Sequence, residues 1–443
     1  MKHCALAALV AVFIVVVTAP AQVIQVAPAT EVARETDPKR FSEPHLAIHP
    51  TNSKHLLAAV FISWVQGALE EIRAHERCAA FVSLDGGATW NRHEFSLESC
   101  FDPQVAILPN GEAVFIALAE IVNIQPRHSI WLIAFHSSDG GLTWDEEPTI
   151  LGRGHDHPAL AVDTSSAKRK GWIYVSTHHE WRDGNGQPAS GVFIARSRDG
   201  GKSFDTPTIV RPNNLHSFAE MPVVLSDGTV IASFVDDTND QPKFERRRAW
   251  IIRSTDGASS FSLPIFVNDV CGPPPNFQLS ALVADTSDGQ FRDRLYFACR
   301  QNGGGSIIVT SSANRGETWN RPGVGVGTPA PDPNARRVLT MGVNRNGVVG
   351  VFIAERSFKI GEACLEFSFS ASFDGGTTFV APQKVSSSSC GKTTADEIAA
   401  RMFPTYGDYF GVVGTNNAKF RLMWVEMRDG HSVLLTTLGT VAP

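Results

Sequence analysis

The stretch SLDGGATW, which runs from Ser83 to Trp90, decides the fold because the chain repeats it five more times. The further copies are SSDGGLTW (137–144), SRDGGKSF (197–204), STDGASSF (254–261), SANRGETW (312–319) and SFDGGTTF (372–379). Successive copies lie 54 to 60 residues apart. A nearly fixed period of this size indicates a repeat architecture, in which each unit packs against the next.

The composition of the stretch predicts a tight turn. Serine and aspartate oxygens accept hydrogen bonds from backbone N–H groups a few residues further on. The glycine pair supplies positive φ between two strands, and the final tryptophan or phenylalanine anchors the turn on apolar neighbours. We therefore expect each copy to connect two antiparallel strands.

The repeated turn resembles the Asp-box, or bacterial neuraminidase repeat, of sialidase-like β-propellers. Two of its positions depart from that pattern, Asn314 and Ala258. The resemblance covers nearly the whole mature chain and implies an all-β propeller with the turns between third and fourth strands. The Asp-box aspartates are structural in this family, so the resemblance decides the fold rather than the function.

Short apolar runs before each turn predict the strands. The third unit contains PALAVD (158–163), GWIYVSTHH (171–179) and GVFIARS (191–197), separated by glycine, asparagine, aspartate and proline. A C-terminal unit without the turn supplies three strands, and VIQVA (23–27) would supply its fourth and remove an exposed edge. We therefore predict seven four-stranded blades, with six blades as the alternative.

The first 21 residues read as a signal peptide. Lys2 is followed by an apolar run and by a small-x-small site at Ala19-Pro20-Ala21. Residues 22–443 would form one propeller domain that is secreted into an extracellular or periplasmic space. With a net charge of −6 and 19% charged residues, we expect no nucleic-acid partner, no membrane span and a monomer.

The six cysteines after the leader predict disulfides, since an even number in an oxidising compartment is typical of them. We expect sequential pairing, as Cys78–Cys100, Cys271–Cys299 and Cys364–Cys390. The first and third pairs bracket one turn each, on either side of a hairpin. Zinc binding is the alternative, but no C-x-x-C spacing supports it.

Loops that enter the first strands, and loops between second and third strands, should meet on the face opposite the turns. Polar residues there form two rings around the channel. The first contains Glu43, Asp102, His155, Asp156, His157, Glu220 and Tyr406, and the second contains His178, Arg300, Glu355, Arg356, Glu426 and Arg428. Acidic residues dominate blades one to four, and arginines dominate blades five to seven. Because arginine binds carboxylates through two hydrogen bonds, such a mouth suits an anionic or polyhydroxyl ligand. Capping of backbone groups is the structural alternative for each acid.

The sialidase resemblance implies three arginines that bind a carboxylate, an aspartate acid/base and a tyrosine nucleophile helped by a glutamate. Substrate-binding candidates are Arg300, Arg356, Arg428, Glu43, Glu220, His155, His157 and His178. Catalytic candidates are Tyr406 with Glu355 or Glu426, and Asp102 or Asp156. The family's Phe/Tyr-Arg-Ile-Pro motif is absent, and Arg40-Phe41-Ser42-Glu43-Pro44 stands in its approximate place.

The sequence thus indicates a secreted propeller that binds or processes extracellular glycans at its channel mouth. The alternatives are an exo-sialidase or other glycoside hydrolase with an arginine clamp, and a non-enzymatic propeller that binds proteins. No cofactor is expected. The histidines of the third unit offer a metal site as a further alternative.

Overall fold

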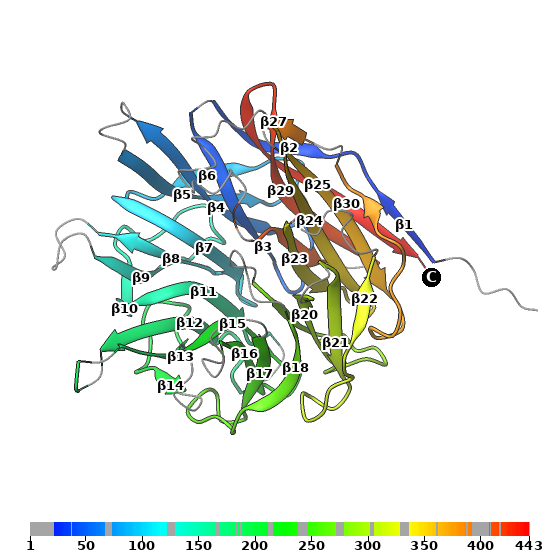
Figure 1. Ribbon diagram of the computed structural model, residues 1–443. Coiled ribbons are helices and arrows are strands. Elements are labelled where there is room, and N and C mark those ends of the chain that lie inside the picture. The colour runs from blue at the N-terminus through cyan, green and yellow to red at the C-terminus, as the bar shows by residue number, and fades with distance from the viewer. Residues whose placement is uncertain are drawn as a thin grey trace, which may run out of the picture.

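The computed structural model describes residues 22–36, 38–66, 73–121, 129–164, 168–182, 184–186, 188–210, 216–237, 247–271, 279–301, 305–327, 336–359, 362–386, 389–391, 407, 409–415 and 418–442. These residues form seven antiparallel sheets, which are the blades of a β-propeller (Figure 1). No helix occurs among them. The prediction of seven blades is confirmed, and the six-bladed alternative is excluded.

The first four blades follow one another along the chain, each running from an inner to an outer strand. Blade 1 contains β3 (Arg40–Ile48), β4 (Leu56–Gln66), β5 (Arg73–Ser83) and β6 (Asn91–Glu94). Blade 2 contains β7 (Ser99–Ile107), β8 (Ala113–Glu120), β9 (Ile130–Ser137) and β10 (Thr149–Arg153). Blade 3 contains β11 (His155–Val162), β12 (Ile173–Arg182), β13 (Pro188–Ser197) and β14 (Thr208–Val210). Blade 4 contains β15 (His216–Val224), β16 (Val230–Asp237), β17 (Arg247–Ser254) and β18 (Ile265–Cys271).

The last three blades complete the ring. Blade 5 contains β19 (Ala281–Ala284), β20 (Leu295–Arg300), β21 (Ile307–Ser312) and β22 (Val324–Val326). Blade 6 contains β23 (Arg336–Val343), β24 (Val349–Lys359), β25 (Glu362–Ser372) and β26 (Gln383–Lys384), with β27 (Ser389–Gly391) also paired to β25. Blade 7 contains β28 (Gly411–Gly414), β29 (Lys419–Arg428) and β30 (His431–Ala442).

The N-terminal segment closes the ring. Strand β1 (Val23–Val26) pairs with β30 as the fourth strand of blade 7, and β2 (Thr30–Thr36) pairs with β30 further along. Figure 1 shows this blue segment beside the red C-terminal strand. The ring is therefore closed by two chain ends that are distant in sequence, as the VIQVA run predicted.

The hydrophobic core lies between the blades rather than at one centre. Seven clusters of buried apolar side chains occur among the described residues, and each joins two neighbouring blades. Leu57 and Ala80 of blade 1, for example, are clustered with Phe115 and Ile133 of blade 2. Strands buried on both faces explain why the apolar runs of the sequence are nearly continuous.

Disulfides reinforce two of these junctions. Cys78 is bonded to Cys100, and Cys271 is bonded to Cys299, as predicted. The expectation that the first pair spans one hairpin was wrong, because Cys100 lies on the first strand of the next blade and so joins blades 1 and 2. Cys364 is also disulfide-bonded, and strand pairing places Cys390 opposite it.

The six repeated turns share one hydrogen-bond pattern. In the first, Ser83 Oγ donates to Asp85 Oδ1 at 2.8 Å and accepts the Gly87 N–H at 2.8 Å. Asp85 then accepts the backbone N–H and the hydroxyl of Thr89. The two departures keep the pattern: Asn314 accepts the Thr318 N–H, and the Ala258 N–H reaches Ser254 Oγ. Each turn lies between a third and a fourth strand.

Replacing Ser137 by Ala should lower the free energy of unfolding by ~1–2 kcal/mol, because the buried hydroxyl both donates to Asp139 and accepts the Gly141 N–H. Ser138→Ala is the matched control, since that neighbour is exposed. Thermal unfolding of the two variants measures the difference. Equal unfolding temperatures would contradict the structural role of this hydroxyl.

Side chains of the preceding blade hold several turns in place. The Gly86 carbonyl accepts a hydrogen bond from Arg421 of blade 7 at 2.5 Å, and the Gly140 carbonyl accepts one from His55 of blade 1 at 2.8 Å. Gly375 accepts from Arg294 of blade 5 at 2.7 Å. The turns therefore form a ring of inter-blade contacts on one face. All six turns lie between third and fourth strands, so the channel mouth on the other face is built from other connections.

Candidate functional site at the channel mouth

Irregular backbone marks the mouth-facing starts of several inner strands. The pairing register shifts after Ser42 in β3, after Phe101 in β7, after Asp156 in β11 and after Ala219 in β15. The shifted positions include Glu43, Asp102 and His157, whose φ angles are 51°, 52° and 46°. All three precede a proline. Positive φ is uncommon in residues other than glycine, and such strain gathers at functional sites.

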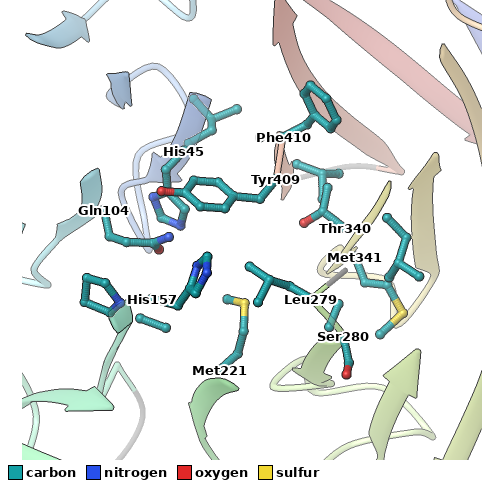
Figure 2. Close-up of a pocket in the computed structure, with 17 residues that line it drawn as sticks. His45, Gln104, His157, Met221, Leu279, Ser280, Thr340, Met341, Tyr409 and Phe410 are labelled. Atoms are coloured by element: carbon teal, nitrogen blue, oxygen red, sulfur yellow. The ribbon is translucent and has the colours of Figure 1, made fainter. Parts of the chain in front are cut away.

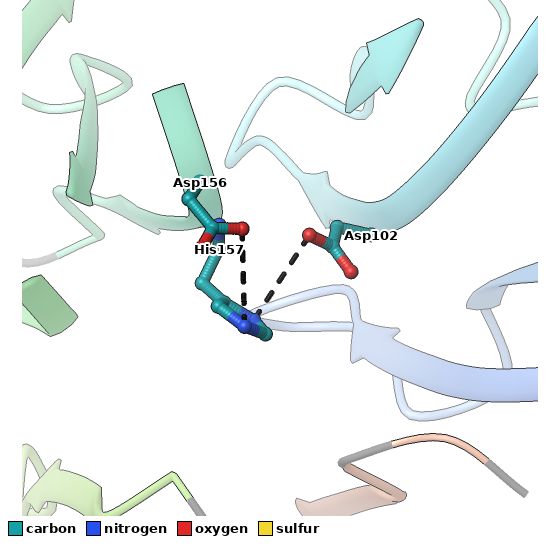
Figure 3. Close-up of side chains that lie close together, drawn as sticks. All are labelled: Asp102, Asp156 and His157. Carbon is teal, nitrogen blue, oxygen red and sulfur yellow. Dashed lines mark hydrogen bonds and ion pairs between the residues drawn. The ribbon is translucent and has the colours of Figure 1, made fainter. Parts of the chain in front are cut away.

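These bulges bring three acids and a histidine together. A side-chain hydrogen bond joins the carboxyl groups of Glu43 and Asp102. The His157 ring lies between two carboxylates, with Nδ1 3.9 Å from Asp102 and Nε2 3.9 Å from Asp156 (Figure 3). Blades 1, 2 and 3 therefore each contribute to one group, which we call the carboxyl cluster: Glu43, Asp102, Asp156 and His157.

The two aspartates of the cluster have different environments. Burial raises the pKa of Asp102, and this effect outweighs the nearby His157 and the hydrogen bond from Glu43, which both favour its charged form. The Asp102 side chain is 10% exposed, whereas that of Asp156 is 48% exposed. Two carboxyl groups whose surroundings differ in this way suit an acid and a base or nucleophile.

The cluster also offers ligand atoms for a cation. One atom each of Asp102, Asp156 and His157 lies within 4.8 Å of the others. Burial raises the pKa of Asp102, however, and a carboxyl that keeps its proton is a poor metal ligand. The donor set therefore fits proton chemistry better than metal binding.

A cavity of about 90 Å³ lies at the channel axis beside the cluster (Figure 2). Inner strands or strand entries of all seven blades line it, and His157 belongs to both the cavity and the cluster. His45 and Gln104 also face this space, each directly after the proline that follows a bulge residue. The carboxyl cluster thus adjoins this cavity through His157.

Two further histidines of blade 3 belong to local contacts. His155 stacks on His179 with ring centroids 4.6 Å apart and meets the edge of Phe193. Burial, with a smaller effect from neighbouring histidines, lowers the pKa of His155 to about 3, so it stays neutral. His178 Nε2 lies 3.1 Å from Glu180 Oε1.

The arginines lie on the later blades and have partners of their own. Arg428 is bonded to Glu426, which is buried and also accepts the Trp424 Nε1–H. Arg337 lies 2.7 Å from Glu355, and its charge helps burial to lower the pKa of Arg300. Arg300 and Arg428 stand on blades 5 and 7, with blade 6 between them.

Some predicted residues lie outside what the structure describes. Tyr406 is not among the described residues, and the side chains of Arg356 and Glu220 are not described either, although their backbones belong to β24 and β15. Neighbouring Gly407 is described, with φ 70°, and a Cβ there would lie 1.9 Å from Glu43 Cγ. The entry to blade 7 therefore packs directly on the carboxyl cluster.

Sequence reasoning missed His45 and Gln104. The signal was present, because x-Pro-y occurs at the entry of β3, β7 and β11 as Glu-Pro-His, Asp-Pro-Gln and His-Pro-Ala. Once the residue before proline forms the bulge, the residue after it is turned toward the channel. His45 and Gln104 follow Glu43 and Asp102 by two residues, and this place beside the proline is the signal that marks them.

No protein-family model matches the chain, and no curated protein matches it in sequence. Among solved structures, a protein of unknown function from Dyadobacter fermentans is similar with a TM-score of 0.50 and 12% identity, covering 95% of this chain and 99% of that one. A Trypanosoma rangeli sialidase has a TM-score of 0.45 and 13% identity over 78% of this chain and 54% of its own. A Penicillium chrysogenum α-L-arabinanase has a TM-score of 0.47 and 14% identity over 75% of this chain and 94% of its own. The similarity to the Dyadobacter fermentans protein, at 12% identity, bears on the fold alone, and the other two similarities, with TM-scores under 0.5, support no conclusion.

Proposed function

We propose that this protein is an exported glycoside hydrolase whose reaction takes place at the carboxyl cluster. The observation that supports this most is the pair Asp102 and Asp156, one buried with a raised pKa and one half-exposed, with oxygen atoms within 4.8 Å of each other. Carboxyl groups held about 5 Å apart are typical of glycosidases that retain the anomeric configuration. The cluster, rather than the remote fold similarity, carries the proposal.

The proposed reaction has two balanced steps. Protonated Asp102 donates its proton to the glycosidic oxygen while that oxygen leaves the anomeric carbon, and the Asp156 carboxylate forms an ester bond to this carbon. Ionised Asp102 then takes a proton from water, whose oxygen attacks the anomeric carbon and releases Asp156. His157, 3.9 Å from each carboxylate, orients the two groups.

The rest of the chain fits an exported protein. We infer that the six turns are Asp-boxes, since their shared hydrogen bonds match the roles expected for those residue types. Residues 1–21 would be removed as a leader, and residues 22–443 would form the whole domain. The disulfides are those of an oxidising compartment. No described segment forms a helix long and apolar enough to cross a membrane.

Hydrolysis should proceed with retention of configuration, because the Asp102–Asp156 separation leaves no room for a water between sugar and base. A panel of 4-nitrophenyl glycosides, with sialosides and uronides included, identifies the substrate for residues 22–443. Proton NMR of the first-formed sugar then gives its anomeric form. An inverted product would contradict Asp156 as nucleophile.

Absence of turnover across the whole panel, from protein shown to be folded, would contradict the proposed hydrolase. Glycan-array binding by the same protein would then support the non-catalytic alternative. Turnover of sialosides alone would favour the arginine-clamp alternative with Arg300 and Tyr406. Chelator treatment of active protein is a further check, since proton chemistry at the cluster requires no metal.

A further inference from the structure

The cavity beside the carboxyl cluster is lined by polar and by apolar side chains. His45, Gln104 and His157 from blades 1 to 3 supply polar groups, and Ser280, Thr340 and Tyr409 from blades 5 to 7 supply others. Leu279, Met341 and Phe410 from blades 5 to 7 lie across from them, as Figure 2 shows. A sugar ring likewise has both kinds of surface, with hydroxyl groups at its edge and C–H groups on its face.

The polar groups of the cavity are fixed before any ligand enters. His45 Nδ1 accepts the Val105 N–H at 3.2 Å, so the ring proton of this histidine is on Nε2. Gln104 is 6% exposed, and its Oε1 is buried with no hydrogen-bond partner among the described residues. His45, with its ring proton on Nε2, and Gln104, with an unsatisfied amide oxygen, therefore line the same cavity. A buried acceptor without a partner favours a ligand that brings a hydroxyl group.

The charges favour a neutral ligand. Among the described residues that line the cavity, none is an aspartate, glutamate, lysine or arginine. Burial lowers the pKa of His45 to about 4, so its ring is uncharged near neutral pH. The Asp156 carboxylate stands beside His157 at the cavity, where a carboxylate sugar would meet like charge.

The size favours a single sugar unit. One water needs about 10–15 Å³ of such space, so the cavity has room for about six to nine waters, comparable to one monosaccharide with its hydroxyl groups. It is closed around the channel axis by strands of all seven blades, so a chain cannot pass sideways through it.

We propose that this cavity is the subsite for one neutral sugar at the end of a glycan, so that the protein is exo-acting on uncharged chain ends. This inference rests on the proposed function. The sugar's hydroxyl edge faces Gln104 and His45, its C–H face packs on Leu279 and Phe410, and its anomeric carbon is directed toward Asp102 and Asp156.

Calorimetric titration of Asp102→Asn protein separates binding from turnover. The probes are free L-arabinose, D-xylose, D-galactose and D-glucose, with D-glucuronic acid and N-acetylneuraminic acid as charged counterparts. We expect one neutral sugar to bind and both acids to fail. Gln104→Leu should weaken that binding about tenfold by removing the acceptor, and Ala281→Leu should abolish it by filling the cavity.

Gln383→Leu is the matched control, because Gln383 is exposed on β26, and it should bind the sugar as tightly as the parent protein. Unfolding temperatures of the variants exclude misfolding as the cause of lost binding. Binding of a charged sugar alone, no binding of any sugar, or binding unchanged by both Gln104→Leu and Ala281→Leu would overturn the inference.

The results also separate this inference from the proposed function. Neutral-sugar binding that Ala281→Leu abolishes, without turnover of any glycoside by the parent protein, would refute the hydrolase and keep the subsite. Turnover of uronides or sialosides alone would keep the hydrolase and refute the neutral subsite.

Discussion

Asp102→Asn should lower kcat/KM for the best glycoside by about 10²- to 10⁴-fold, the contribution typical of a general acid. Asparagine has the size of aspartate but cannot deliver a proton to the leaving oxygen. Steady-state rates on an aryl glycoside measure the loss. Asp288→Asn is the control, since that aspartate is fully on the surface, with its side chain 95% exposed. A variant that kept a tenth of the parent activity would contradict the role of Asp102.

The same substitution should not destabilise the protein at neutral pH. Burial raises the pKa of Asp102 in the folded protein, so the folded state holds the proton more tightly than the unfolded state. The groups that face this carboxyl are Glu43, Asp156 and His157. Stability from the bound proton is therefore fully present at acid pH and is lost as pH rises through the raised pKa.

Asparagine has no proton to lose, so Asp102→Asn should lack this part of the pH dependence. The comparison uses the unfolding temperatures of parent and variant over a series of pH values. The series starts at about pH 4, the ordinary pKa of an aspartate, and continues upward. The curves of unfolding temperature against pH should converge at acid pH. At higher pH the Asp102→Asn variant should be the more stable protein. Parallel curves would show that Asp102 titrates as an ordinary surface carboxyl.

Ile24→Asp should lower the free energy of unfolding by about 4 kcal/mol, which for a domain of this size corresponds to ~5 °C in unfolding temperature. Ile24 is 7% exposed and belongs to the cluster of buried side chains between blades 6 and 7. A charge there loses its water without gaining a partner. It also weakens the pairing of β1 with β30, which closes the ring.

Gln25→Asp is the matched control, because Gln25 follows Ile24 on the same strand and its side chain is exposed. Differential scanning calorimetry of both variants tests the closure. The control should unfold within about 1 °C of the parent, since exposed substitutions change stability little. Equal effects of the two substitutions would mean that β1 contributes only its backbone, and no effect of either would contradict closure by this strand.

The fold was predictable because its signals recur. Six copies of one turn fixed the period, and the apolar runs between them fixed four strands for each blade. The unpaired run at residues 23–27 then accounted for the missing strand of blade 7, and β1 occupies that position. The partners of the first disulfide were predicted correctly, but its place relative to the blades was not. A repeat counted from one turn to the next includes the first strand of the following blade, and Cys100 lies on that strand.

The site was predictable only in part. Glu43, Asp102, Asp156 and His157 were all named from their place before the first strands, and the structure brings these four together. Their separation into a buried and an exposed carboxyl depends on the strand bulges, which sequence spacing does not report. A carboxylate clamp formed by Arg300, Arg356 and Arg428 stays a prediction. In the structure Arg428 is bonded to Glu426, and Arg337 lies against Glu355.

Cavity residues were harder still to foresee. Gln104 and His45 each follow a proline at which the sequence pattern predicts the start of a strand. The alternation of side chains along a regular strand does not predict which way a side chain points after a bulge. Their role follows only once the register shifts are known.

Mass spectrometry of a trapped intermediate tests the central claim most directly. The protein is mixed with a 2-fluoro glycoside of the sugar that the panel identifies, and the intact mass and peptides are measured. We predict a mass increase of one fluorosugar, carried by the peptide that contains Asp156 and absent in Asp156→Asn. An unmodified protein that still hydrolyses the parent glycoside, or a sugar attached outside the carboxyl cluster, would contradict catalysis by Asp102 and Asp156.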